Sequence, residues 1–360
     1  MRRSFAGISR RLPIEGLGRP ANPPAPANGG ARPRAGLSLG EALALGVLQG
    51  PTELLPVSSS GHTTLVPWLA GRPYSQLDPQ LRKAFEVALH AGAGLALALS
   101  MRAELRSEIR ELDRRRACVV ALSLMPPVLC GYAFENAIER RLGGPRSIAV
   151  GLLAGATAML IADARAGARA RVGRHGDAIP GLEQPPPERR HHGGPMPGLE
   201  QPPPGRRREN EGRRRESALS GRPREDAGPC DGLALGLAQA AALAPGVSRS
   251  GAAFTAARAR GFARTDAVSL SWHAALPVIA GASALKGWRL TRARAQGSRL
   301  PPDAPRLLLV GASSAFASTL ASAGALQRPA LSGRSPLPWA LYRGALAVAA
   351  MRRLRHERAQ

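Results

Sequence analysis

The 360-residue sequence predicts an all-α integral membrane protein built from two inverted repeats. Three observations lead to this fold class. Six apolar blocks have nearly the length of a membrane span and are flanked by arginine. Two further apolar stretches are interrupted by Pro, Gly and Ser where a spanning helix would continue. These two interrupted stretches also share a pattern of residues. Each repeat is therefore expected to hold one re-entrant broken helix pair and three transmembrane helices.

The six expected spans are blocks with at most one charged residue each. A helix needs about 17–25 apolar residues to cross the hydrocarbon core. Core helices of soluble proteins are striped with polar residues, and these blocks are not. The expected spans are 84–101, 117–134 and 147–162 in the first half, and 267–285, 307–326 and 337–351 in the second.

The two interrupted stretches, 38–68 and 231–256, align with a shift of 190 residues. Irregular backbone at membrane depth is tolerated only inside protein or beside a wet cavity, which indicates re-entrant segments. Three spans follow each stretch, and an odd number of spans inserts the two copies in opposite orientations. The matching pairs are Gly46/Gly236, Gln49/Gln239, Ser58/Ser248, Ser60/Ser250 and Gly61/Gly251.

The remaining segments are expected to lie outside the membrane repeats. Residues 1–37 predict a disordered basic extension, without the apolar run of a secretory signal peptide. Residues 163–230 predict a disordered insert rich in Pro and Arg, which contains a tandem duplication of the run PGLEQPPP. Residues 353–360 form a basic tail. The predicted membrane repeats are thus 38–162 and 231–352.

The net charge of +25 is carried almost entirely by arginine, since the chain has two lysines. Such a charge alone would suggest a nucleic-acid-binding protein. The arginines, however, flank the apolar blocks or lie in the extension and the insert. We therefore expect contacts with membrane lipids and no nucleic-acid partner. The three cysteines lie far apart and form no CxxC pair, which excludes a disulfide scaffold and a cysteine-ligated zinc ribbon.

Inverted repeats would bring their two broken segments face to face near the middle of the membrane. The Ser-x-Ser-Gly loops supply hydroxyl and backbone N–H groups for phosphate oxygens, and Arg249 supplies a bidentate donor. His62 is a candidate to accept a proton or to attack phosphorus, and Glu53 to hold a divalent cation or to pair with Arg249. The expected site comprises Glu53, Ser58, Ser59, Ser60, His62, Ser248, Arg249, Ser250 and Gly251.

At this point the sequence resembles the bacterial undecaprenyl-diphosphatases of the bacitracin-resistance type. Gly46–His62 is similar to the first signature of that family, and Pro245–Gly251 is similar to the second. The resemblance covers residues 38–162 and 231–352. Shorter matches are Phe85-Glu86, Arg264–Ser271, Leu276-Pro277 and Pro338–Arg343.

The resemblance implies a multi-pass enzyme of the bacterial inner membrane. It would hydrolyse undecaprenyl diphosphate to undecaprenyl phosphate and inorganic phosphate, recycling the lipid carrier for peptidoglycan synthesis and conferring bacitracin resistance. By resemblance, Ser59 and His62 are the nucleophile and the general base, in an order that remains open. Arg249 would hold the diphosphate. Ser58, Ser60, Ser248 and Ser250 would form its hydroxyl-rich surround.

The family also implies a divalent cation, Mg²⁺ or Ca²⁺, at Glu53 and Gln49. Here the chain departs from the usual pattern, because Gln49 stands where the family often has glutamate. His90 stands where glutamine is common, and Arg258 replaces an apolar residue. A lipid or small-anion transporter on the same inverted-repeat scaffold is the alternative function. The sequence leaves the formation of homo-oligomers open.

Overall fold

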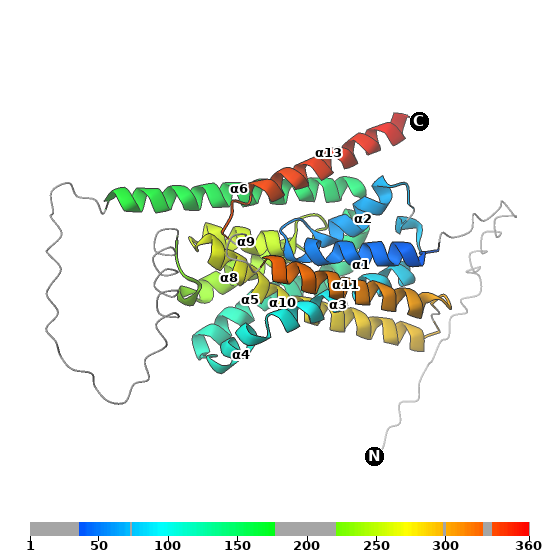
Figure 1. Cartoon of the computed structure of the whole chain (residues 1–360), viewed down its shortest axis with the longest axis horizontal. Coiled ribbons are helices and arrows are strands. Elements are labelled where there is room, and N and C mark those ends of the chain that lie inside the picture. Colours follow the sequence, from blue (N-terminus) through cyan, green and yellow to red (C-terminus); the bar gives the residue numbers. More distant parts are fainter. Residues whose placement is uncertain (1–35, 73, 177–220, 298–299, 327–332, 360) are drawn as a thin grey trace, which may run out of the picture. The chain divides into compact units, whose positions relative to one another are not determined.

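The structure, a computed structural model, describes residues 36–72, 74–176, 221–297, 300–326 and 333–359 (Figure 1). Helices make up these residues, apart from turns and one isolated bridge between Arg222 and Phe262. The expected basic extension falls outside the described residues up to residue 35. The expected insert at 163–230 falls outside them between residues 177 and 220.

The first half of the described chain is a broken helix pair followed by longer helices. The pair is α1 (Leu39–Leu54) and α2 (Ser59–Leu69), and the short 3₁₀ helix η1 (Tyr74–Gln76) comes next. The following helices are α3 (Pro79–Ser100), α4 (Arg102–Arg110), α5 (Arg114–Leu142) and α6 (Pro145–Gly176). Helices α3 and α4 meet at a bend of 70°.

The second half repeats this order after the 3₁₀ helix η2 (Arg224–Asp226). Its broken pair is α8 (Pro229–Ala241) and α9 (Arg249–Ala259), followed by α10 (Arg264–Ala295), α11 (Ala304–Leu326) and α13 (Leu337–Ala359). The expected breaks in both apolar stretches are therefore present. In the first stretch residues 55–58 interrupt the helix, and in the second the interruption spans 242–248.

Four helical segments of the described part are long and apolar enough to cross a membrane, namely Arg114–Phe134, Pro145–Ala170, Arg264–Arg292 and Ala304–Ala325. A fifth is added if the bent pair α3–α4 counts as one span. The sixth expected span, 337–351, is helical as part of α13 but is not among these segments. Arg343 in its middle and the basic residues after Met351 reduce its apolar character.

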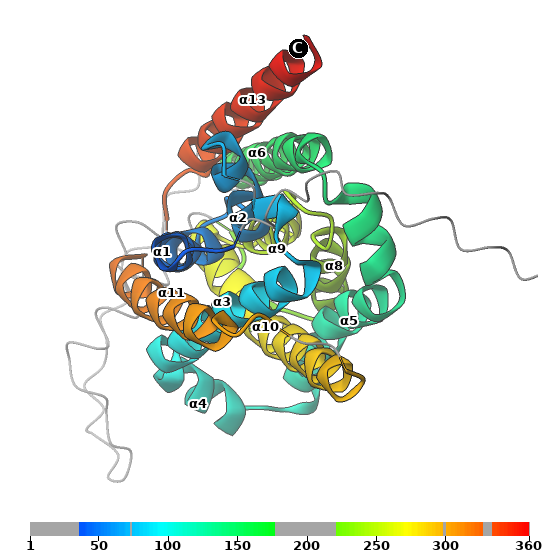
Figure 2. The ribbon, with the colours of Figure 1, turned by 90° about the vertical axis from the view of Figure 1, so that its right-hand side faces the viewer.

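The first helix of each broken pair packs mainly against a helix of the other half. Helix α1 lies along α11, and α8 lies along α5 (Figure 2). Glycines at equivalent positions make the close approach possible. A methyl group on Gly46 would overlap Ser314 and the carbonyl of Gly311 in α11, and one on Gly236 would overlap the carbonyl of Leu122 in α5. Small residues of this kind favour close helix packing in lipid.

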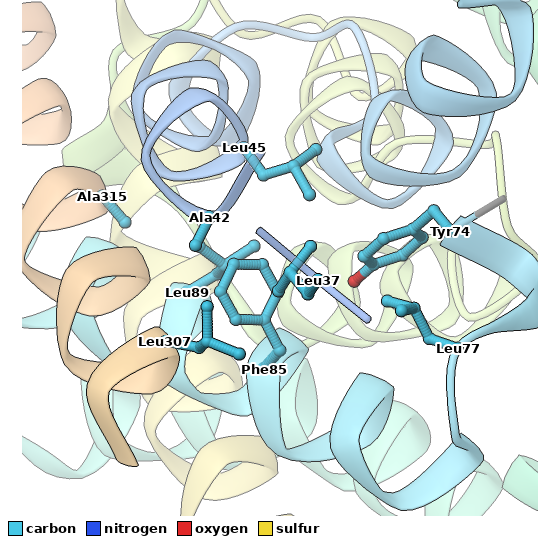
Figure 3. Packing of buried hydrophobic residues seen from close by; sticks show 9 residues of the cluster. All are labelled: Leu37, Ala42, Leu45, Tyr74, Leu77, Phe85, Leu89, Leu307 and Ala315. Atoms are coloured by element: carbon cyan, nitrogen blue, oxygen red, sulfur yellow. The ribbon is translucent and has the colours of Figure 1, made fainter. Parts of the chain in front are cut away.

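A buried apolar cluster holds the start of α1 against α3 and α11 (Figure 3). Leu37 precedes the N-cap Ser38 and Ala42 follows it in the first turn, so both contact the cluster from the entry to α1. Phe85 is fully buried in its centre. The cluster fixes the direction of α1, whose last turn carries Glu53. Its members are Leu37, Ala42, Leu45, Tyr74, Leu77, Phe85, Leu89, Leu307 and Ala315.

Two segments expected outside the membrane repeats are helical instead. Helix α6 continues through residues 163–176, and α13 continues to Ala359, so neither expected boundary, at residue 162 or at residue 352, ends its helix. Alanine and arginine are good helix formers, which accounts for both extensions. Helices α6 and α13 lie side by side over part of their length (Figure 1).

The extension of α6 also supplies the partner of Arg258, the arginine that replaces an apolar residue. This arginine is only 2% exposed, and its Nε donates to the carboxylate of Asp163 at 2.8 Å. Arg264 donates to the same carboxylate at 2.9 and 2.7 Å. Asp163 thus joins α6 to α9 and α10, and the buried charge of Arg258 is neutralised by its partner.

Candidate active site

The two broken segments have the same local structure at their serine loops. Ser58 has φ 76° and Ser248 has φ 73°, and they are the non-glycine residues of positive φ in the described part of the chain. Each is the N-cap of the helix that follows, and its hydroxyl accepts a hydrogen bond from the N–H of Gly61 or Gly251. Such backbone conformations are costly for serine and are typical of functional sites.

Each loop also holds two serine hydroxyls at nearly the same distance from each other. Ser58 Oγ lies 3.5 Å from Ser60 Oγ, and Ser248 Oγ lies 3.4 Å from Ser250 Oγ. The second loop also contacts the first, since Ser250 Oγ donates to the carbonyl of Leu55 at 2.9 Å. Each loop begins a helix of eleven residues, whose first N–H groups favour negative charge.

Arg343 of α13 holds the two loops together. It is fully buried, and its guanidinium donates to the carbonyl of Pro56 in the first loop at 3.2 Å. It also donates to the carbonyls of Gly246 and Val247 in the second loop, at 3.0 and 2.8 Å, and to that of Gly151 in α6 at 3.4 Å. The planar fork of arginine suits this task, because one side chain satisfies several carbonyls that a broken helix leaves unpaired.

Glu53, at the end of α1, is the centre of the polar contacts between the halves. Its side chain is 6% exposed, and its Oε1 accepts from Arg249 Nη2 at 3.4 Å. Its Oε2 accepts from the amide of Gln49 at 2.9 Å and lies 3.4 Å from His90 Nδ1. The side chain of Ser59 is a near neighbour of the same carboxylate. Sequence reasoning placed these groups together, except for His90.

His62 is buried in α2, one turn after Ser58. Its ring nitrogens contact Ser58 and Tyr342. Its Nδ1 lies 2.7 Å from the carbonyl oxygen of Ser58, and its Nε2 lies 2.7 Å from the hydroxyl of Tyr342 in α13. Both ring nitrogens are therefore engaged. The base that lies beside the Ser59 hydroxyl is Glu53.

A small cavity of about 60 Å³ adjoins the polar groups at Ser250. It is lined mainly by apolar and aromatic side chains from both halves of the chain, including Leu54, Phe254, Trp272 and Trp339. Trp272 also donates its indole N–H to the carbonyl of Leu54 at 3.2 Å. The site therefore combines phosphate-binding chemistry with an apolar surface beside it.

The groups around Glu53 fit one kind of site for a hard cation, in which substrate phosphates complete the coordination. Glu53 is the single carboxylate there, Gln49 adds one amide oxygen if its amide is turned, and His90 offers nitrogen. No group of three His, Cys, Asp or Glu side chains in the described residues is placed to hold a metal ion. Mg²⁺ is commonly bound by one or two carboxylates together with substrate phosphates. The residues fit that kind of site.

Sequence reasoning assigned no role to Tyr342, Arg343 or His90. A signal was present for Arg343, because it is the lone charge in an apolar block, and charges inside such blocks are commonly functional. His90 and Tyr342 had no local signal of this kind. The residues that they contact lie 37 or more positions away in the sequence, so only the fold reveals these contacts.

Comparison with known proteins identifies the family of the chain. The family model described as bacitracin resistance protein BacA matches residues 42–185 and 206–349. The chain belongs to the BacA family. Membership of this family, together with the long apolar helices, makes it a multi-pass membrane protein.

Several curated relatives of this BacA-family chain are named undecaprenyl-diphosphatase. One from Geobacter sulfurreducens is 31% identical over 273 residues, which cover 72% of this chain and 80% of the relative. One from Cupriavidus necator is 29% identical, covering 71% and 76%. A third, from Pelobacter propionicus, is 32% identical, covering 69% and 75%.

Proposed function

We propose that this protein hydrolyses undecaprenyl diphosphate to undecaprenyl phosphate and inorganic phosphate. The observation that carries the proposal is the meeting of Glu53, Arg249 and two serine loops beside an apolar cavity. The names of the relatives identify the same reaction. The activity would recycle the lipid carrier for peptidoglycan synthesis in the bacterial inner membrane and confer resistance to bacitracin.

Binding of the diphosphate uses donors from both halves. Arg249, whose side chain is 23% exposed, exchanges part of its contact with Glu53 for a bidentate contact with phosphate oxygens. The hydroxyls of Ser58, Ser60, Ser248 and Ser250 and the N–H groups of the loops surround the remaining oxygens. The N–H of Gly251 contributes by holding the Ser248 hydroxyl in place. The apolar cavity beside Ser250 receives the start of the lipid tail.

In the first chemical step the Ser59 hydroxyl attacks the terminal phosphorus. Its proton passes to the neighbouring carboxylate of Glu53, which we assign as the base. The bond between the terminal phosphorus and the bridging oxygen breaks, and undecaprenyl phosphate leaves with the electron pair. Because His62 has both nitrogens engaged, we assign the attack to Ser59.

In the second step a water molecule attacks the phosphoserine. The Tyr342 hydroxyl turns its hydrogen away from Nε2 of His62, and that nitrogen accepts the proton of the water. The Ser59–phosphorus bond breaks, and Ser59 recovers its proton from Glu53. Inorganic phosphate leaves, and His62 returns its proton to solvent. Stabilisation of the phosphoryl oxygens by Arg249 and the loop donors supplies most of the rate enhancement, as is usual for phosphoryl transfer.

A divalent cation, Mg²⁺ or Ca²⁺, held by Glu53 and the Gln49 amide oxygen would supply further positive charge to the diphosphate. We also propose that residues 38–162 and 231–352 are inverted repeats. Support comes from the matching φ angles and N-caps of Ser58 and Ser248, and from the reciprocal packing of α1 on α11 and of α8 on α5.

The proposal is tested by phosphate release from undecaprenyl diphosphate in detergent. Arg249→Ala is expected to lower kcat/KM by about a hundredfold or more, because a hydrogen-bonded charge at the phosphoryl group is lost. Arg306→Ala removes an exposed arginine from α11 and is expected to retain full activity. Activity in Arg249→Ala equal to that of the control would rule out the assigned site.

The alternative function, transport of a lipid or small anion, is not favoured. The relatives are named as diphosphatases, and the site holds a hydroxyl beside a carboxylate base. Movement of the lipid across liposome membranes without release of phosphate would support transport instead.

A further inference from the structure

The hydrogen bond between His62 and Tyr342 connects helices at opposite ends of the chain. His62 Nε2 and the Tyr342 hydroxyl oxygen are 2.7 Å apart and come from α2 and α13. The two rings are also stacked, with centroids 5.4 Å apart and planes inclined by 11°. Two independent contacts therefore fix the position of one ring relative to the other.

The partners of His62 determine where its protons lie. The carbonyl oxygen of Ser58 can only accept a hydrogen bond, so Nδ1 must carry the hydrogen and donate it. In the neutral ring the lone pair is then on Nε2, and the Tyr342 O–H donates to it. Nε2 is thus the basic nitrogen of His62, and Tyr342 is its partner.

The backbone beside Tyr342 connects this pair of residues to the serine loops. His62 is completely buried, whereas Tyr342 is 45% exposed. The next residue, Arg343, binds carbonyls of both serine loops, so the backbone that carries Tyr342 is fixed to the loops themselves. Any change that moves the loops relative to α13 will also move the hydroxyl that faces Nε2.

We infer that Tyr342 is a positioning residue for the hydrolysis. It holds the imidazole of His62 with Nε2 as the unprotonated nitrogen, directed towards the Tyr342 hydroxyl of α13. The inference rests on the proposed function, because it concerns the proton acceptor of the second step. It predicts that removal of the hydroxyl impairs chemistry more than substrate binding.

The test compares Tyr342→Phe with Tyr132→Phe. Phenylalanine keeps the stacked ring at position 342, so only the hydroxyl is lost. Tyr132 is an exposed tyrosine on α5 and serves as the matched control. We expect kcat of Tyr342→Phe to fall by about tenfold or more, which corresponds to about 1.4 kcal/mol. KM and the thermal midpoint are expected to stay close to those of the control.

A spectroscopic measurement separates positioning from a purely structural role. In protein labelled with ¹⁵N-histidine, with His62→Gln used to assign the signal, the His62 ring should show protonated Nδ1 and hydrogen-bonded Nε2 at neutral pH. The Nε2 signal should shift in Tyr342→Phe and remain unchanged in Tyr132→Phe.

Three outcomes would overturn the inference. They are a protonated Nε2 in the unmodified protein at neutral pH, an unchanged kcat in Tyr342→Phe, and a fall in stability without a shift of Nε2. Failure of the proposed function looks different, because the unmodified protein would then release no phosphate while its His62 signals could still be measured.

Discussion

At the scale of single residues, the two serine N-caps show how a local backbone conformation prepares a site. Ser58 and Ser248 adopt positive φ, which brings the next N–H groups and hydroxyls to one side of each loop. The cap hydrogen bonds to Gly61 and Gly251 offset part of the cost of this conformation.

Substitution of Ser248 should separate the contribution of the cap to stability from the cost of the strained backbone. Alanine loses the cap and keeps the unfavourable φ, whereas glycine loses the cap but adopts positive φ freely. We expect Ser248→Ala to be less stable than Ser248→Gly by about 1–2 kcal/mol, measured by thermal unfolding in detergent.

The control for this comparison is Ser38, the N-cap of α1, which has an ordinary φ of −81°. There the alanine and glycine variants should differ by less than at position 248. Both lose the cap, and neither has to adopt an unfavourable φ. An equal difference at both positions would show that strain at Ser248 contributes nothing.

Gln49 provides a second prediction at this scale. Its amide donates to Glu53 at 2.9 Å, so Gln49→Glu places two carboxylates side by side, and their repulsion favours a bound cation. We expect a chelator to remove a larger share of phosphate release from Gln49→Glu than from the unmodified protein, and added Mg²⁺ to restore it. Titration with Mn²⁺ followed by electron paramagnetic resonance should show tighter binding.

The exposed Gln296 serves as the control, since Gln296→Glu adds the same charge far along the chain from the site, after α10. Equal sensitivity of the two variants to chelator would contradict a cation site at Glu53.

At the scale of the elements, close helix contacts depend on glycine. Gly46 and Gly50 face α11, and Gly232 and Gly236 face the backbone of α5. The same arrangement occurs in both halves because the pattern at Gly46 and Gly236 recurs after 190 residues. These contacts determine how far α1 and α8 enter the protein, and therefore where Glu53 and the serine loops lie.

Gly46→Ala should consequently destabilise the protein by about 1–3 kcal/mol, because the added methyl group has no space against α11. Gly40→Ala in the same helix meets no atom within 4 Å, and alanine is the better helix former, so no loss is expected. Thermal unfolding in detergent compares the two. A neutral Gly46→Ala would mean that α1 and α11 can separate without loss of stability.

At the scale of the whole molecule, the proposed inverted repeats predict opposite orientations for equivalent connections. The segment between α3 and α5 carries Ser107, and the segment after α10 carries Gln296. In a chain without native cysteines, Ser107→Cys and Gln296→Cys should react with a membrane-impermeant maleimide from opposite sides of the membrane. Labelling of both from the same side would contradict inversion.

Much of this arrangement could be predicted from the amino-acid order. The apolar blocks, the two interrupted stretches and the convergence of Glu53 with Arg249 depend on local composition and on a repeated spacing. The ends of α6 and α13 were predicted less well, because helix formation by alanine and arginine continues past the point where apolar character ends.

The sequence by itself determined the chemical groups of the site, because residue type and spacing within each serine loop are local properties. Only the tertiary structure decided which groups pair. It placed Ser59 beside Glu53, turned His62 towards Tyr342, and joined both loops through Arg343. Tyr342 and Arg343 lie 280 or more positions from the first loop, and contacts over that separation depend on helix packing that no local pattern encodes.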